Sequence, residues 1–156
     1  MYMSKYTSTK VIPLGSCAFR QPLADSHCRF LHGYRLQAKF WFGCNHLDNK
    51  NWVVDFGGLK GLKTSLEEIF DHKTVIWSKD PQIETFKLMA DQGIIELIML
   101  EQGVGIERFA ELCHNMANDY IDNLTQSRCW CSKVEVWEHE GNSAIYESEP
   151  QSGWKS

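Results

Sequence analysis

The amino-acid sequence predicts a single α+β domain, a sheet with helices packed on one face. Residues 34–42 alternate strictly between apolar and other side chains, which is the pattern of a half-buried strand. Residues 59–70 and 106–124 carry apolar side chains at helical spacing, and residues 133–137 alternate again. A chain of 156 residues is long enough for one domain with a substantial core.

The first half of the chain predicts strands. Residues 11–20 mix Val, Ile, Leu and Phe and are expected to form the first strand, and the polar segment 20–33 is expected to be a loop. The alternating strand 34–42 is followed by a predicted turn over 45–51 and by a predicted partner strand over 52–56. A hairpin is therefore expected before the first helix.

Gly57 and Gly58 interrupt the strand pattern, and the first predicted helix then ends near Asp71. The polar tail after Glu147 is expected to fray, which leaves a core over about 11–146. The remaining predicted elements are a short strand or extended segment at 94–100, a helix at 106–124 and a strand at 133–137.

Composition limits the classes of partner. The net charge of -4, with both signs mixed along the chain, argues against a general nucleic-acid binder. No apolar run approaches the roughly 20 residues that cross a bilayer, and residues 1–10 lack the apolar centre of a signal peptide. Six scattered cysteines fit reduced thiols better than a disulfide framework. We expect a cytoplasmic protein with no membrane or nucleic-acid partner.

Cys28 and His32 are the first candidates for chemistry. A thiol becomes a base or nucleophile when a nearby cation, metal or helix N-terminus lowers its pKa, and Arg29 would supply positive potential. His32 is a candidate metal ligand. A cysteine and a histidine four residues apart in a loop are also often structural, so the pair alone does not decide between the two interpretations.

Asp71 and His72 are the second candidates. A carboxylate beside an imidazole sets its tautomer and raises its basicity, and histidine is the usual general acid or base. The alternative is a helix C-terminus at which His72 interacts with free carbonyls.

Glu138 is a candidate ligand-binding carboxylate. If the last strand continues past Trp137, Glu138 points to the same side as Val134 and Val136 and needs a partner, for example two adjacent N–H groups of a planar heterocycle. If the strand ends at Trp137, Glu138 is simply solvated.

These pieces occur in an order that resembles the 6-pyruvoyl-tetrahydropterin synthase and 6-carboxytetrahydropterin synthase family, from about Val11 to Tyr146. The family has a cysteine before a His-Gly-His strand start, a V-x-D-F-x-x-L-K helix entry, an L-D-H motif, a T-x-E-N helix start and a final V-x-E-T…A-x-Y strand. The matching segments here are Cys28…His32-Gly33-Tyr34, Val53–Lys60, Phe70-Asp71-His72, Gly105-Ile106-Glu107-Arg108 and Val136-Trp137-Glu138-His139…Ala144-Ile145-Tyr146.

The resemblance implies the tunnelling fold: a four-stranded antiparallel sheet with two helices on one face. Subunits of that fold join their sheets into a barrel, commonly as two stacked trimers, so a homo-oligomer (trimer or hexamer) is expected. It also implies a pterin pocket between subunits, in which Glu138 grips the ring and Glu107 is a second pocket acid. Cys28 would be the catalytic thiol, and Asp71 and His72 the proton relay.

The resemblance further implies zinc, bound in the family by three histidines. The corresponding positions here are Cys17, His32 and Tyr34, so only one histidine is retained. A cysteine thiolate ligates zinc readily, whereas tyrosine is an unusual ligand. His27 is an alternative ligand if the loop folds differently, and otherwise a polar loop residue.

The implied function is that of a 6-carboxytetrahydropterin synthase-like lyase, which acts on 7,8-dihydroneopterin triphosphate and leads toward 7-deazaguanines such as queuosine. Arg20 and Arg29 are candidates to hold the triphosphate, or solvated loop residues. The alternative is a protein of the same fold that binds a pterin or purine without zinc or without catalysis.

Overall fold

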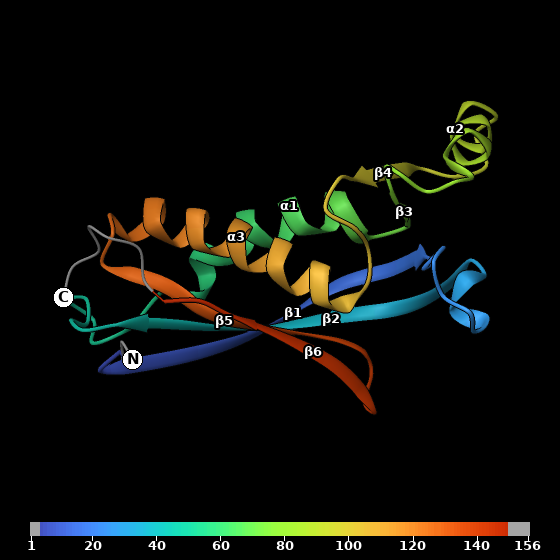
Figure 1. The fold of residues 1–156 in the computed structure, drawn as a ribbon. Helices are drawn as coiled ribbons and strands as arrows, with labels where there is room; N and C mark the ends of the chain where they lie inside the picture. Colours follow the sequence, from blue (N-terminus) through green and yellow to red (C-terminus); the bar gives the residue numbers. More distant parts are fainter. Residues whose placement is uncertain (1–3, 150–156) are drawn as a thin grey trace.

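The computed structural model describes residues 4–149 of the chain. Six strands and three α-helices, together with two short 3-10 helices, form the described part (Figure 1). In chain order the elements are β1 (Tyr6–Phe19), η1 (His27–Arg29), β2 (His32–Cys44), η2 (Phe56–Leu59), α1 (Lys60–Phe70), β3 (Lys73–Trp77), α2 (Ile83–Asp91), β4 (Leu97–Leu100), α3 (Ile106–Thr125), β5 (Cys129–His139) and β6 (Asn142–Glu147).

The strands form one mixed sheet in the order β4-β3-β1-β2-β5-β6. The neighbours β1/β2, β2/β5 and β5/β6 pair antiparallel, whereas β1/β3 and β3/β4 pair parallel. Only Cys17 and Ala18 of β1 pair with β3, so the unit β3-α2-β4 adjoins one end of the sheet. Figure 1 shows α1 and α3 on the same face of the sheet and α2 at the far end of this added unit.

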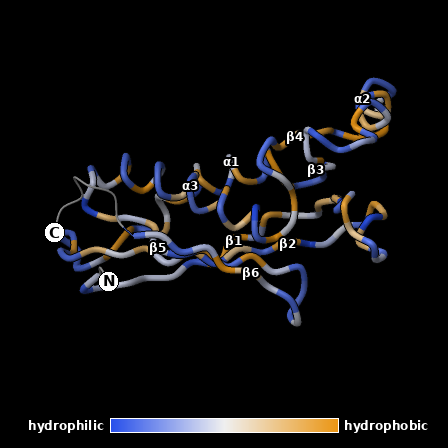
Figure 2. Tube along the Cα trace, viewed as in Figure 1, coloured by the Kyte–Doolittle hydropathy of each residue, from blue (hydrophilic) through white to orange (hydrophobic). Residues whose placement is uncertain are grey.

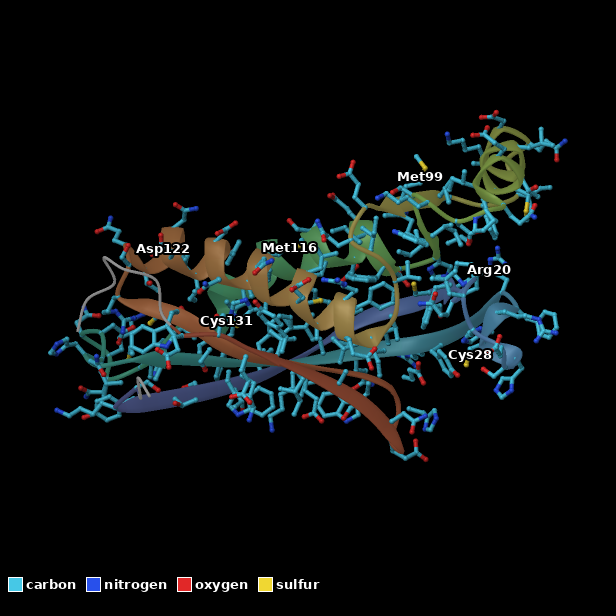
Figure 3. The ribbon with its side chains drawn as sticks, in the orientation of Figure 1. Arg20, Cys28, Met99, Met116, Asp122 and Cys131 are labelled. Atoms are coloured by element: carbon cyan, nitrogen blue, oxygen red, sulfur yellow. The ribbon has the colours of Figure 1, made fainter. Side chains whose placement is uncertain are left out.

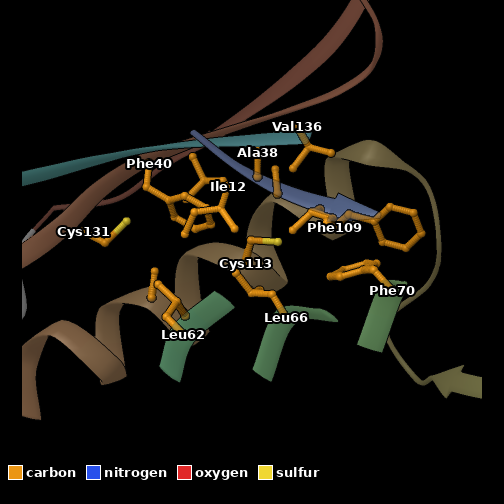
Figure 4. Close-up of a cluster of buried hydrophobic side chains, with 14 of the residues drawn as sticks. Ile12, Ala38, Phe40, Leu62, Leu66, Phe70, Phe109, Cys113, Cys131 and Val136 are labelled. Carbon is orange, nitrogen blue, oxygen red and sulfur yellow. The ribbon is translucent and has the colours of Figure 1, made fainter. Parts of the chain in front are cut away.

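The core lies between that face and the two helices. Leu62, Leu66 and Phe70 of α1 and Phe109 and Cys113 of α3 are fully or almost fully buried against the sheet (Figure 4). The opposite side of α3 is hydrophilic, as Figure 2 shows. Burial of this apolar surface is the main driving force that holds the helices on the sheet.

A β-bulge at Gly15 resets which residues of β1 face the core. The register with β2 shifts between Pro13 and Gly15, and Gly15 has φ +106°, which favours glycine. Before the bulge Leu14 points inward; after it, Cys17 is buried and Ser16 lies on the open face of the sheet. Simple alternation from Leu14 would have placed Ser16 inside.

Several sequence-based expectations need correction. The sheet has six strands and is mixed, rather than four-stranded and antiparallel, because the segment 73–100 adds β3 and β4 by parallel pairing. Residues 52–56 do not pair as a strand; Asp55 caps η2 instead, its carboxylate accepting from Gly57 N at 2.9 Å. The strand β6 was not predicted, and neither were β3 and α2. The first strand begins at Tyr6, and β5 begins at Cys129.

Other expectations are confirmed. The helices expected over 59–70 and 106–124 are α1 and α3, and the short strand expected within 94–100 is β4. Most of the predicted polar tail lies outside the described residues. Within residues 4–149, none of the helices has both the length and the apolar character that a bilayer span requires.

The packing of α1 gives a direct test of the core. Leu66 is fully buried, whereas Leu88 on α2 is 55% exposed. We expect Leu66→Ala to lower the free energy of unfolding by about 3 kcal/mol because it leaves a cavity. The matched change Leu88→Ala should cost no more than about 0.5 kcal/mol. Urea denaturation measures both, and equal losses would contradict the observed packing.

Candidate active site

A pocket of about 720 Å³ lies where β2 begins and β5 ends, beside the start of α3. We call it the Glu138 pocket; among its lining residues are Phe19, Cys28, His32, Ile106, Glu107 and Glu138. Its volume is that of a small-molecule site. Four residues predicted from the sequence to act in catalysis or binding, one thiol, one imidazole and two carboxylates, thus share one pocket.

Glu138 reaches this pocket because β5 continues to His139. The strand does not end at Trp137, so the solvated alternative does not hold. Val134 and Val136 are fully buried on the helix-covered face, and Glu138 is half-buried at a register shift between Trp137 and His139, where it lines the pocket. Glu107 approaches from the first turn of α3, where a carboxylate also interacts favourably with the helix dipole.

Cys28 is the accessible thiol of the chain. It lies in η1, where its backbone N–H donates to the Ser26 hydroxyl at 3.4 Å and its carbonyl accepts from Gln21 N at 2.9 Å. Figure 3 shows it at the β3–β4 end of the molecule. The other five cysteines are buried. Burial raises the pKa of Cys17 and of Cys131 to about 12, so these thiols stay protonated.

His32 is oriented by the backbone. Its Nδ1–H donates to the Phe30 carbonyl at 2.7 Å, which in the neutral ring leaves the lone pair on Nε2. The Tyr34 ring meets His32 edge to face, with centroids 5.3 Å apart. Burial, followed by the charges of Glu138 and Cys28, raises the pKa of Tyr34, which therefore remains a neutral phenol.

Asp71 and His72 form a separately built dyad directly after α1. Asp71 Oδ1 lies 3.0 Å from His72 Nδ1 and also accepts from Ser16 N at 3.2 Å. His72 N donates to Ser16 O at 2.7 Å, and His72 has a left-handed φ of +60°. A Cβ on Gly15 would lie 2.1 Å from Asp71 Oδ1. The glycine bulge and the strained histidine therefore fix the dyad geometrically.

The dyad lies in a different depression, which we call the His72 hollow. It measures about 420 Å³ and includes Ser16, Ala18, Gly33, Arg35, His72 and Thr74 in its lining. Ser16 is paired with Arg35, and Ala18 with both Gly33 and Thr74. Gly33 and Arg35 are exposed on the open face, whereas His32 and Tyr34 point to the helix-covered face. One chain therefore does not bring His72 and Cys28 into one pocket.

The residues expected to hold zinc do not fit a metal centre. Cys17 is 3% exposed, and its thiol is protonated and directed into the core by the Gly15 bulge. Tyr34 is a neutral phenol. His27 is exposed and does not line the Glu138 pocket. Within residues 4–149, no three His, Cys, Asp or Glu side chains converge.

Arg20, which the sequence analysis proposed as a triphosphate ligand, forms an ion pair with Asp80 that the sequence did not reveal. Its guanidinium donates to both oxygens of Asp80, at 2.9 and 2.5 Å, and to the Arg29 carbonyl at 3.2 Å. Burial alone would raise the pKa of Asp80, but the Arg20 hydrogen bond and the Gln82 N–H outweigh it, so that pKa is lowered. This clamp ties the unit β3-α2-β4 to the turn that carries Cys28. Nothing local in the sequence marks Asp80.

Comparison with known proteins agrees with this architecture. The sequence pattern of the 6-pyruvoyl tetrahydropterin synthase family matches residues 15–149. An uncharacterised protein of Wolinella succinogenes has a similar structure, with a TM-score of 0.80, 18% identity and coverage of 92% of this chain and 98% of that one.

Two enzymes have similar structures at lower scores. The 6-pyruvoyl tetrahydropterin synthase of Plasmodium falciparum has a TM-score of 0.64 and 14% identity, over 91% of this chain and 98% of the enzyme. That of Caenorhabditis elegans has a TM-score of 0.63 and 20% identity, over 96% and 100%. At these identities the likeness shows the fold. No curated protein sequence matches the chain.

The exposure of Cys28 predicts selective chemistry. Iodoacetamide should modify one cysteine per native chain, because the other five are buried. Intact mass and peptide mapping should place the adduct on Cys28, and Cys28→Ser should take up none. Labelling of a second cysteine at a comparable rate would contradict the burial described above.

The Arg20–Asp80 clamp predicts a pH-dependent stability. Asp80→Asn should cost about 2 kcal/mol at pH 7, since it leaves a mostly buried guanidinium without its counter-charge. Folding lowers the pKa of Asp80. The stabilisation that ionised Asp80 gives the folded protein is therefore complete above the pKa of Asp80 in the unfolded chain. It is lost as the pH falls through the lower pKa of Asp80 in the folded protein. The loss relative to the parent should thus shrink in acid. The exposed control Glu84→Gln should cost no more than about 0.5 kcal/mol at pH 7 in the same urea titrations.

Proposed function

The chain belongs to the 6-pyruvoyl tetrahydropterin synthase family, and on that basis we propose that it is a lyase that binds a reduced pterin in the Glu138 pocket. The finer assignment is the 6-carboxytetrahydropterin synthase reaction on 7,8-dihydroneopterin triphosphate, in a pathway to 7-deazaguanines. The observation that carries the proposal is the convergence of Cys28, His32, Glu107 and Glu138 on one pocket of ligand size.

Glu138 accounts for ring recognition. A carboxylate presents two acceptor oxygens and matches the adjacent N–H groups on the edge of a pterin. It is half-buried beside the apolar Phe19 and Ile106, so a bound ring desolvates it and each hydrogen bond strengthens. This geometry favours a flat, N–H-rich heterocycle over a sugar or an aliphatic acid.

Cys28 and the dyad account for proton transfer. Cys28 is the accessible thiol at the pocket and would exchange a proton with the substrate side chain. The dyad leaves His72 Nε2 facing outward, with 83% of the side chain exposed. Within one chain Cys28 and His72 lie in different depressions. We therefore propose that His72 reaches the Glu138 pocket of a second subunit. This proposal requires a homo-oligomer, and the family resemblance favours a trimer or hexamer.

Zinc, which the resemblance implies, is assigned no step because Cys17 is buried in the core and no three His, Cys, Asp or Glu side chains converge within residues 4–149. That misfit favours a second candidate function: binding of a pterin or purine without turnover. The two candidates differ in one measurement, the release of acetaldehyde from 7,8-dihydroneopterin triphosphate, made with added zinc and with a chelator.

Substitutions separate binding from chemistry. Glu138→Gln should weaken binding of 7,8-dihydroneopterin by about 30-fold, the effect of a lost charged hydrogen bond, in a fluorescence titration. The control Glu84→Gln changes an exposed carboxylate on α2 that does not line the pocket and should bind normally. Cys28→Ala should bind normally and lose turnover by about 100-fold or more.

The outcomes decide between the candidates. Binding that depends on Glu138 together with turnover that depends on Cys28 supports the lyase. If pterin binding depends on Glu138 but no acetaldehyde forms with added zinc or with a chelator, the protein binds the pterin without turnover. Equal pterin affinity in parent and Glu138→Gln would refute both.

A further inference from the structure

A triphosphate ligand needs cations that the Glu138 pocket does not offer. Its lining includes two carboxylates, Glu107 and Glu138, and one guanidinium, Arg20. That guanidinium is held by both oxygens of Asp80 and by a backbone carbonyl. Arg29, in the adjacent turn, donates to the carbonyls of Asp25 and Ser26 and lies over the Phe30 ring. A phosphate chain must therefore find its charge partners elsewhere.

The His72 hollow has an uncommitted cation. Arg35 is exposed there and forms no hydrogen bond or ion pair within residues 4–149. Its cross-strand partner is Ser16, whose carbonyl accepts from His72 N, so Arg35 and His72 flank the same residue. Directly opposed strand residues lie about 5 Å apart at Cβ, within reach of one small anion.

The floor and wall of the hollow suit an oxyanion. Ala18 pairs with Gly33, and these two small residues line the hollow next to the Ser16–Arg35 pair. Thr74, next to Ala18 on β3, is 6% exposed, and its hydroxyl has no hydrogen-bond partner in the described part of the chain. A hydroxyl in that state is available to donate to a ligand oxygen.

The acids near the hollow are already paired. Asp71 is bonded to His72 and to Ser16 N, and Glu96 forms an ion pair with Lys73. Neither carboxylate therefore neutralises the charge of Arg35. An exposed guanidinium with adjacent N–H and O–H donors binds phosphate oxygens better than it binds neutral groups.

We propose that the His72 hollow is a phosphate-binding subsite in which Arg35, with the donors of His72 and Thr74, holds the phosphate chain of a phosphorylated ligand. This inference rests on the proposed function, because it places the phosphates of a pterin bound in a second subunit's Glu138 pocket beside the relay histidine. It also accounts for the absence of a free guanidinium at the Glu138 pocket itself.

The test compares two ligands that differ only in phosphate. The affinities of 7,8-dihydroneopterin and of its triphosphate are measured on the parent, Arg35→Gln and the control Arg108→Gln, which removes an exposed arginine from outside the hollow. The parent should bind the triphosphate about tenfold more tightly, the value of one charged contact. Arg35→Gln should abolish that advantage and leave 7,8-dihydroneopterin binding unchanged, and Arg108→Gln should retain the advantage.

Inorganic triphosphate provides an arm that does not depend on the pterin. Calorimetry should detect its binding to the parent, weakening with added salt, and not to Arg35→Gln. An unchanged triphosphate advantage in Arg35→Gln, or an equal loss in Arg108→Gln, overturns the subsite. If neither pterin binds the parent, the proposed function fails, while binding of inorganic triphosphate through Arg35 would still support the anion site.

Discussion

The antiparallel ladder between β1 and β2 is the constraint on which the site depends. Consecutive residues of a strand point to opposite faces, so His32 and Tyr34 point toward the helices while Gly33 and Arg35 point to the open face. The thiol and the carboxylates therefore gather on one side and the Asp71–His72 dyad on the other. Any reaction that uses both sets of groups needs the sheets of two chains, which ties chemistry to assembly.

The Gly15 bulge adds a second constraint to the same ladder. By inserting one residue it moves Cys17 into the core and brings Ser16 to the open face, where its N–H and carbonyl hold Asp71 and His72. One backbone irregularity thus buries Cys17 and supports the Asp71–His72 dyad. Its cost is a left-handed His72 and a position where any side chain would collide with Asp71.

The sequence predicted the parts of the fold that strong periodicity marks. The helices over 59–70 and 106–124 and the strand through Phe40 have long amphipathic patterns, and β5 continues past Trp137 as one of the two alternatives for Glu138 required. It failed for residues 73–91, because β3 is buried on both sides and α2 buries little beyond Phe86, so neither shows a clear period. The bulge was also invisible in the sequence, so alternation along β1 did not predict that Cys17 faces the core and Ser16 the open face.

The departure from three histidines has a structural counterpart in the Arg20–Asp80 clamp. The turn that bears Cys28 is held by the Arg20 guanidinium, which bonds both Asp80 and the Arg29 carbonyl. Charged hydrogen bonds of this kind are strong enough to fix the position of a short turn. The clamp draws its carboxylate from the segment 73–100, which gives that added unit a role in the geometry of the pocket.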